Sequence, residues 1–120
     1  MSNILVVEND AITREWLTEI LAGHQVLTAR DGREACSLVK RHDVDLVITE
    51  VSPPNEGGLG LIRSMQKDRP KIKIIVFSGA GRETLLDTKV AGAHAVLRKP
   101  ATEKAVLQCV RDILVSGEQI

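Results

Sequence analysis

The stretch LVITE, residues 46–50, is a short β-branched apolar run that ends in one carboxylate. Three other runs share this form, and each leads into a polar or charged group; they are ILVVEND (4–10), IIVFSG (74–79) and VLRKP (96–100). Continuous apolar runs of this length, bounded by turn residues, are typical of strands buried on both faces of a parallel sheet. In such a sheet the binding crevice lies just beyond the carboxyl ends of the strands. We therefore expect a cluster of carboxylates, a hydroxyl and one lysine to meet in a single crevice.

Helical patterns alternate with these strands along the chain. The first has five apolar residues at helical spacing, namely Ile12, Trp16, Leu17, Ile20 and Leu21. After a predicted strand at 25–29, the later helical patterns contain the sets Ala35, Leu38 and Val39; Leu61, Ile62 and Met65; Leu85, Leu86 and Val90; and Val106, Leu107, Val110, Ile113 and Leu114. Residues 52–58 are predicted to form a loop. Such short connections predict parallel strands joined by right-handed crossovers.

Residues that favour helix ends stand at the predicted boundaries. Asp31-Gly32 is a turn that opens the second helix. Gly92 is expected to end the fourth helix, and Thr102 is expected to cap the start of the last. The chain therefore divides into five strand–helix units.

The composition fits one ordinary domain. The chain has 120 residues, so we assign 1–120 to a single domain, with 116–120 as the possible start of a linker. Sixteen basic and sixteen acidic residues give a formal net charge of zero, which argues against a nucleic-acid or anionic-membrane surface. With no apolar run long enough to span a bilayer and no signal peptide before the first strand, we expect a cytoplasmic location. Cys36 and Cys109 are interpreted as small buried side chains, and a disulfide is not expected.

Taken together, these residues resemble the receiver domain of bacterial two-component response regulators, over essentially the whole chain. The residues that carry the resemblance are Glu8 after the first strand, Glu50 after the third with Pro54 and Gly58 four and eight positions on, Ser78 after the fourth, and Lys99-Pro100 after the fifth. The resemblance implies a flavodoxin-like, doubly wound (βα)5 fold. This α/β fold is a three-layer sandwich whose parallel sheet has strand order 2-1-3-4-5.

The resemblance also implies a chemistry. In the family, an Asp after the third strand attacks a phosphohistidine of a partner kinase and becomes an acyl phosphate. Acidic residues after the first strand hold Mg²⁺, which neutralises the developing charge. The hydroxyl and the lysine after the fourth and fifth strands grip the phosphoryl group, and their movement reshapes the surface around the last two helices. By resemblance, Glu50 holds the phosphoacceptor position, Ser78 and Lys99 are the gripping residues, and the magnesium ligands are Glu8, Asn9 and Glu50.

The sequence departs from the family at the centre of this site. Glu50 replaces the phosphorylated Asp, and Asn9 replaces the Asp that ligates magnesium directly. Asp10 follows Asn9, but its side chain is expected to point elsewhere. The extra methylene moves the Glu50 carboxylate by roughly 1 to 1.5 Å, a misplacement that can cost about a hundredfold in rate. The neutral amide of Asn9 removes a charge from a site for a divalent ion, so we expect weak magnesium binding at best.

These departures predict a pseudo-receiver, which signals through protein contacts without phosphorylation of an Asp. Asn9 relieves repulsion between carboxylates, so Glu50 can stay ionised without a metal and pair with Lys99. Ser78 is a further candidate partner of Glu50, and this arrangement would partly imitate the phosphorylated state. The alternative is a receiver that still accepts phosphate in a magnesium-dependent way, on Glu50 or on a substitute residue. In a third interpretation, Glu50 is a strand-end carboxylate without a role.

A further departure concerns how the signal would leave the site. Family members that signal through a rotating ring carry Tyr or Phe three residues before the lysine, where this chain has Val96. Ser78 therefore lacks an aromatic partner of that kind. The resemblance still implies docking of a sensor kinase or an effector domain. The expected faces are the first helix and the surface of the fourth helix, fifth strand and fifth helix, and a homodimer is left open.

Other chemistries fit the sequence less well. A flavin- or nucleotide-binding protein of this topology needs a phosphate-binding loop after the first strand, where the acidic residues at 8–10 would repel phosphate. A hydrolase needs a nucleophile–histidine pair near the crevice. His24, His42 and His94 all precede strands, so we expect them at the opposite edge of the sheet. The sequence therefore favours a signalling domain over an enzyme.

Overall fold

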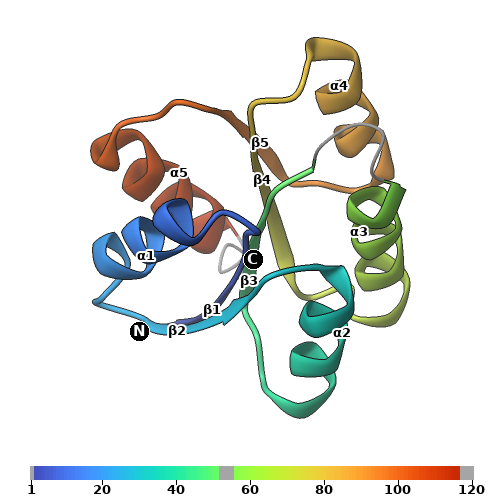
Figure 1. The fold of residues 1–120 in the computed structure, drawn as a ribbon. Coiled ribbons are helices and arrows are strands. Elements are labelled where there is room, and N and C mark those ends of the chain that lie inside the picture. The colour runs from blue at the N-terminus through green and yellow to red at the C-terminus, as the bar shows by residue number, and fades with distance from the viewer. Residues whose placement is uncertain (1, 52–55, 117–120) are drawn as a thin grey trace.

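The structure is a computed structural model that describes residues 2–51 and 56–116. In this part of the chain, five strands alternate with five helices (Figure 1). Their bounds are β1 Asn3–Val7, α1 Ala11–Ile20, β2 Gln25–Ala29, α2 Gly32–Arg41, β3 Leu46–Thr49, α3 Glu56–Asp68, β4 Lys73–Ser78, α4 Arg82–Ala91, β5 Ala95–Arg98 and α5 Glu103–Ser116. Every neighbouring pair of strands is parallel, and the sheet order is β2-β1-β3-β4-β5. The predicted fold class and strand order are confirmed.

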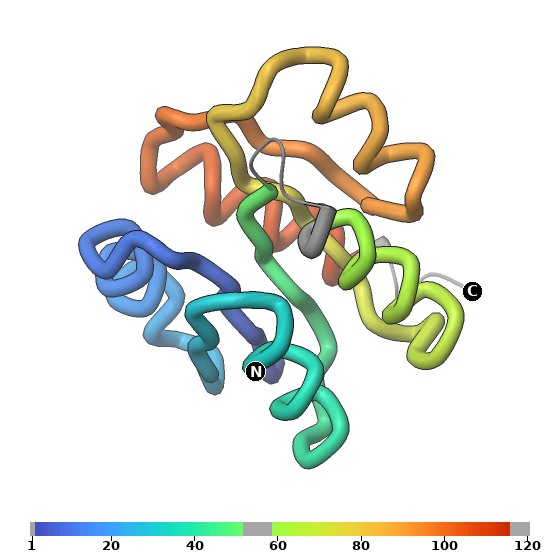
Figure 2. The backbone as a smooth tube through the Cα atoms, turned by 45° about the vertical axis from the view of Figure 1, so that its right-hand side comes forward, coloured from blue at the N-terminus to red at the C-terminus, as the bar shows by residue number. Residues whose placement is uncertain are grey.

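Helices cover both faces of the sheet and give the three predicted layers (Figures 1 and 2). Successive side chains of a strand point to opposite faces. Leu5 and Val7 of β1 belong to the core beneath α2, α3 and α4, whereas Ile4 and Val6 belong to the core beneath α1 and α5. The strands are therefore apolar at consecutive positions because both of their faces are buried.

The edge strand β5 is less buried than its sequence suggested. Its first three residues are half-buried and Arg98 is exposed. The strand order places β5 at the end of the sheet, where it pairs with β4 alone. The prediction of burial on both faces therefore holds for β1, β3 and β4, and is corrected for β5.

Three apolar residues of the helical patterns are exposed, namely Ile12, Leu86 and Val90, with exposed fractions of 78%, 55% and 89%. In α4 the buried positions are Leu85 and Thr88, so Leu86 and Val90 lie outside the core. Ile12 lies in the first turn of α1, near the carboxyl end of the sheet. Helical spacing therefore located the helices without identifying which apolar residues reach the core. Among the described residues, no helix combines the length and the apolar character that crossing a membrane would need.

The predicted helix ends are largely confirmed. Asp31 accepts a hydrogen bond from the Glu34 N–H at 2.9 Å, and the Thr102 hydroxyl accepts one from the Ala105 N–H at 3.1 Å. Gly92 ends α4 with a φ of 126°, a conformation that favours glycine.

The start of α3 differs from its prediction. The helix begins at Glu56, within the stretch 52–58 that was predicted as a loop, and residues 52–55 lie outside the described residues. Glycine weakens a helix by only about 1 kcal/mol per residue, and the burial of Leu61 and Ile62 in the core favours the helix they belong to.

The two cysteines lie on opposite faces of the sheet. Cys36 packs against the core beneath α2, α3 and α4, and Cys109 packs against the core beneath α1 and α5. Both are free, half-buried thiols. The sheet between them excludes the disulfide that the sequence had already disfavoured.

Two histidines accept backbone hydrogen bonds at the amino-terminal edge of the sheet. The Nδ1 atom of His24 accepts the Ser2 N–H at 3.2 Å, and the Nδ1 atom of His94 accepts the Ile74 N–H at 3.0 Å. Both therefore lie at the edge opposite the carboxyl ends of the strands, as predicted. Burial lowers the pKa of His94, and the nearby charges of Lys73 and Lys89 lower it further.

This geometry predicts a pH dependence of stability. Because the folded state lowers the pKa of His94, the unfolded state binds the proton more tightly. The free energy of unfolding should therefore be undiminished above about pH 6.5 and should fall as the pH drops below that value. Urea unfolding at about pH 7.5 and about pH 5.5 measures the difference. His94→Gln keeps an acceptor for the Ile74 N–H but cannot be protonated, so it should lose less stability over this range. An equal loss in both proteins would contradict the assignment.

Candidate functional site

The carboxyl ends of β1, β3 and β5 bring three charged side chains together. Glu8, Glu50 and Lys99 each follow the last residue of their strand, and their backbone N–H groups continue the hydrogen-bond ladder of the sheet. The alternation of side chains therefore continues by one position as well. It directs all three toward the face that α1 and α5 cover.

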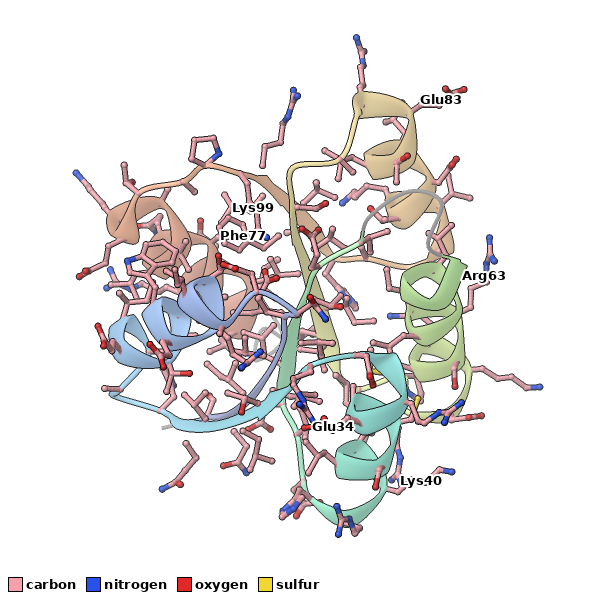
Figure 3. All side chains as sticks on the ribbon, viewed as in Figure 1. Glu34, Lys40, Arg63, Phe77, Glu83 and Lys99 are labelled. Carbon is pink, nitrogen blue, oxygen red and sulfur yellow. The ribbon has the colours of Figure 1, made fainter. Side chains whose placement is uncertain are left out.

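Lys99 binds both carboxylates at once. Its Nζ atom lies 2.7 Å from Glu8 Oε1 and 2.9 Å from Glu50 Oε1. Glu8 is nearly buried, with 4% of its side chain exposed. The ammonium also lies 5.3 Å from the centre of the Phe77 ring, and Figure 3 shows Lys99 beside Phe77. The predicted pair of Glu50 and Lys99 is present, and Glu8 is a second partner that sequence reasoning missed.

All four oxygens of these two carboxylates accept hydrogen bonds. Glu8 Oε2 accepts the Asp10 N–H at 3.1 Å, and Glu50 Oε2 accepts the Val51 N–H at 2.7 Å. Arg14 adds positive charge nearby, because its guanidinium donates to the Glu8 carbonyl at 2.9 Å. The chain itself therefore provides a hydrogen-bond partner for every oxygen of the two carboxylates.

The carboxylates also keep Lys99 charged. Burial lowers the pKa of the Lys99 ammonium, but its hydrogen bonds to Glu8 and Glu50, together with their charges, raise it by more. The net effect is a pKa above the ordinary lysine value of 10.5. Because the folded pKa of Lys99 is raised, the stability that its protonation contributes is present just below pH 10.5 and is lost as the pH rises through the folded value.

The residues after Glu8 do not join this cluster. Asn9 is exposed. Asp10 caps α1, where its carboxylate accepts the Thr13 hydroxyl at 2.6 Å and the Thr13 N–H at 2.9 Å. These two hydrogen bonds lower the pKa of Asp10. The expectation that the Asp10 side chain points elsewhere is confirmed.

Ser78 does not contact Glu50, and this expectation is corrected. The Ser78 hydroxyl donates to the Val51 carbonyl and accepts the Ala80 N–H at 3.1 Å. Phe77 belongs to the core beneath α1 and α5, so alternation turns Ser78 toward the opposite face. Glu50 therefore lies on one side of the sheet and the Ser78 hydroxyl on the other.

Pro54, Gly58 and Pro100 also carried the resemblance to receiver domains. Pro54 lies outside the described residues. Gly58 lies in the first turn of α3, and Lys99-Pro100 follows β5 with a cis peptide bond. Val96, where an aromatic ring was noted as missing, is half-buried against the core beneath α2, α3 and α4.

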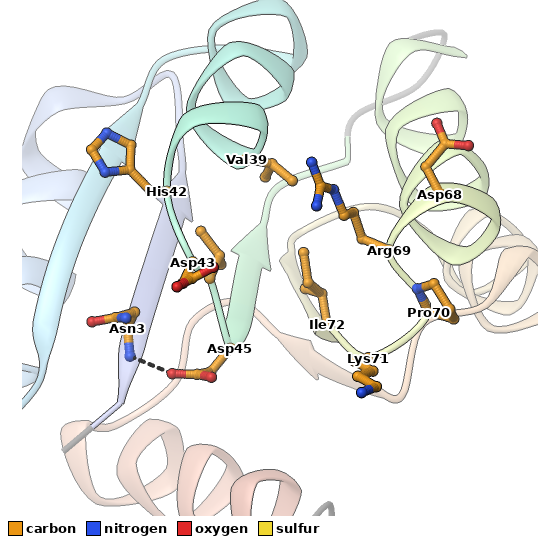
Figure 4. Close-up of a pocket in the computed structure, with 11 residues that line it drawn as sticks. Asn3, Val39, His42, Asp43, Asp45, Asp68, Arg69, Pro70, Lys71 and Ile72 are labelled. Carbon is orange, nitrogen blue, oxygen red and sulfur yellow. Dashed lines mark hydrogen bonds between the residues drawn. The ribbon is translucent and has the colours of Figure 1, made fainter.

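A hollow also lies at the amino-terminal edge of the sheet, opposite the charged cluster (Figure 4). Charged and polar residues of both signs line it, among them His42, Asp43, Asp45, Arg69 and Lys71. The Asp45 carboxylate accepts the Asn3 N–H at 2.8 Å, which ties the start of β1 to the entry of β3. Because these charges are mixed and most are exposed, the hollow favours no one class of ligand.

The fold and the cluster together define a receiver domain. A sequence model of the response regulator receiver domain matches residues 4–111, so this chain belongs to that family. The DNA-binding transcriptional regulator NtrC of Azospirillum brasilense is 37% identical over 121 residues, which cover 97% of this chain and 25% of that protein. The chemotaxis protein CheY of Thermotoga maritima is 30% identical over 114 residues, which cover 92% of this chain and 95% of that protein.

A solved structure supports the same assignment. A response regulator from Thermotoga maritima superposes with a TM-score of 0.87 at 27% identity, covering 96% of this chain and 98% of that one. The chain spans about a quarter of the NtrC relative and nearly all of the CheY relative.

The double pairing predicts that Lys99 is important for stability. Lys99→Met would remove the ammonium that pairs with both the nearly buried Glu8 and its neighbour Glu50. We expect a loss of about 2 kcal/mol, less than the 3–5 kcal/mol typical of fully buried pairs, because Lys99 keeps some exposure. Urea unfolding at neutral pH measures this loss in the free energy of unfolding. Lys104→Met, which removes an exposed lysine of α5, is the matched control. Equal stability of the two variants would contradict the prediction.

Proposed function

We propose that this receiver domain of two-component signalling is a pseudo-receiver, which signals through protein contacts without phosphorylation of an Asp. The observation that carries the proposal is the Lys99 ammonium, which bridges Glu8 and Glu50 at 2.7 and 2.9 Å. The phosphoacceptor position is thereby held in an ion pair that needs neither a phosphoryl group nor a metal. In this account the chain is a signalling module of the cytoplasm and not an enzyme.

The crevice fits a magnesium ion poorly. Magnesium requires about six oxygen ligands in near-ideal octahedral geometry. The four carboxylate oxygens of Glu8 and Glu50 already accept hydrogen bonds, and Asn9 is neutral and exposed. Among the described residues, no group of three or more His, Cys, Asp or Glu is placed to hold a metal. We infer that Lys99 supplies the positive charge for which the family uses magnesium, and that magnesium binds here weakly at best.

The imitation of a phosphorylated site is partial. By resemblance, a phosphorylated receiver has its lysine and its hydroxyl both turned toward the phosphoryl group. Here Lys99 is turned toward Glu50, but the Ser78 hydroxyl donates to Val51. Only the lysine half of the active arrangement is therefore reproduced.

A phosphate-accepting receiver is the second candidate. One observation favours it, because 21% of the Glu50 side chain is exposed and solvent can reach the carboxylate. A phosphoryl group on Glu50 would have to displace Lys99 from that oxygen or share it. This candidate predicts magnesium-dependent labelling of Glu50 or of a substitute residue.

The partners proposed are proteins, either a sensor kinase or an effector domain, and a second copy of the chain is compatible with the same surfaces. The faces are α1 and the surface formed by α4, β5 and α5. Exposed apolar side chains lie on both, namely Ile12 on α1 and Leu86 and Val90 on α4. The balanced net charge supports proteins over nucleic acid or membrane as partners.

Intact mass after incubation with acetyl phosphate tests the proposal, with magnesium present or removed by a chelator. We expect no phosphoryl adduct in either condition, because Lys99 occupies the acceptor oxygen and magnesium has no ready ligand set. The double variant Asn9→Asp/Glu50→Asp restores the residues of the family and is the positive control, which should be labelled only with magnesium. A magnesium-dependent adduct on the unmodified chain would overturn the pseudo-receiver, and mapping it would identify the residue that accepts phosphate.

A further inference from the structure

The Lys99 ammonium lies against a pair of aromatic rings as well as between its two carboxylates. It lies 5.3 Å from the centre of the Phe77 ring, and the centre of that ring lies 6.3 Å from the centre of the Trp16 ring. A cation over a ring and two tilted rings at this spacing are both attractive contacts. Trp16 belongs to α1. The two rings therefore connect Lys99, and with it the charged crevice, to a helix that covers one face of the sheet.

The packing around Phe77 allows a movement of the ammonium to reach Trp16. Phe77 is 3% exposed and belongs to the core beneath α1 and α5. Protein interiors are close-packed, so a buried ring cannot shift without moving the side chains that lie against it. Trp16 is half-buried against the same core, so part of its ring borders on solvent and has room to move. A displacement of Lys99 over the Phe77 ring therefore changes the position of Trp16.

The helix at the end of this route is lightly anchored in the core. Within α1, which the structure describes throughout, only Leu17 is fully buried. Arg14 donates to the backbone carbonyl of Glu8 and not to its carboxylate, so it does not contact the charged side chains of the crevice. Ile12 stands four residues before Trp16, and residues at this spacing are neighbours on a helix surface. Because Ile12 is 78% exposed, the aromatic pair ends beside apolar surface that α1 presents to solvent.

We infer that Phe77 and Trp16 transmit the position of the Lys99 ammonium to α1. A change at Glu50 that releases the ammonium from that carboxylate leaves Glu8 as its one carboxylate partner. The ammonium then moves over the Phe77 ring, and Trp16 follows. Phe77 is thus a positioning residue, which acts on α1 through Trp16. This inference deepens the proposed function, and it rests on that proposal in taking α1 as a surface on which a partner docks.

¹⁹F NMR of the full chain, grown with 5-fluorotryptophan, tests this route. The chain has one tryptophan, so the spectrum holds one signal and that signal reports Trp16. Glu50→Gln removes the charge from one of the two carboxylates and weakens its hydrogen bond to Lys99. We expect this substitution to shift the Trp16 signal in the otherwise unchanged chain. In a Phe77→Leu background it should shift the signal by less than about a third as much, because the two substitutions act on one route.

Two control variants keep the test specific. Ile75→Val trims another buried side chain of the same core without removing a ring, and the response to Glu50→Gln should stay intact in that background. Glu83→Gln removes the charge of an exposed residue of α4 and should leave the Trp16 signal in place. If Phe77→Leu does not fold, Trp16→Leu replaces it, because Trp16 is only half-buried. The backbone amide of Ile20, at the far end of α1, is then the reporter, and its response to Glu50→Gln should be lost.

A shift of equal size in the Phe77→Leu background would mean that the charge of Glu50 acts on Trp16 without the ring, and it would overturn the inference. No shift in any background would do the same. The phosphodonor experiment fails or succeeds separately. A phosphorylated chain with a response that depends on Phe77 would remove the pseudo-receiver and keep the aromatic route. A chain that takes no phosphate and shows no response would keep the pseudo-receiver and remove the route.

Discussion

A single ammonium group between two carboxylates holds the carboxyl end of the sheet together. Glu8, Glu50 and Lys99 come from the ends of β1, β3 and β5, which are far apart in sequence. Taking a charge out of water is costly unless a partner and hydrogen bonds compensate for it. Lys99 provides that partner for both carboxylates, and the Asp10 and Val51 N–H groups satisfy the remaining oxygens. The arrangement of the crevice depends on this one cation.

The fold and one ion pair could be predicted from the sequence because their causes are local. Consecutive apolar residues in β1, β3 and β4 require cover on both faces, and strand–helix alternation then permits few topologies. Glu50 and Lys99 each follow a predicted strand, and parallel strands bring their carboxyl ends to one edge. Their pairing therefore follows from topology and charge alone.

The contacts that could not be predicted depend on side-chain direction and on burial. Alternation along β4 turns Ser78 away from Glu50, but the sequence does not show that the strand extends to Ser78. Alternation that continues one residue past β1 and β5 places Glu8 and Lys99 on the same face of the sheet. The exposure of Leu86 and Val90 follows from how α4 packs, because the short helix turns only Leu85 and Thr88 inward. Helical spacing alone does not show which apolar residues of a helix are buried.

The central claim is that Lys99 takes the place of the metal, and a magnesium titration of the chain followed by ¹H–¹⁵N NMR tests it most directly. The amides of Glu8, Asn9 and Val51 are the reporters. The account predicts no saturable shift of these resonances at millimolar magnesium, while Asn9→Asp/Glu50→Asp shows saturable binding under the same conditions. Saturable binding by the unmodified chain, centred on Glu8 and Glu50, would contradict the account.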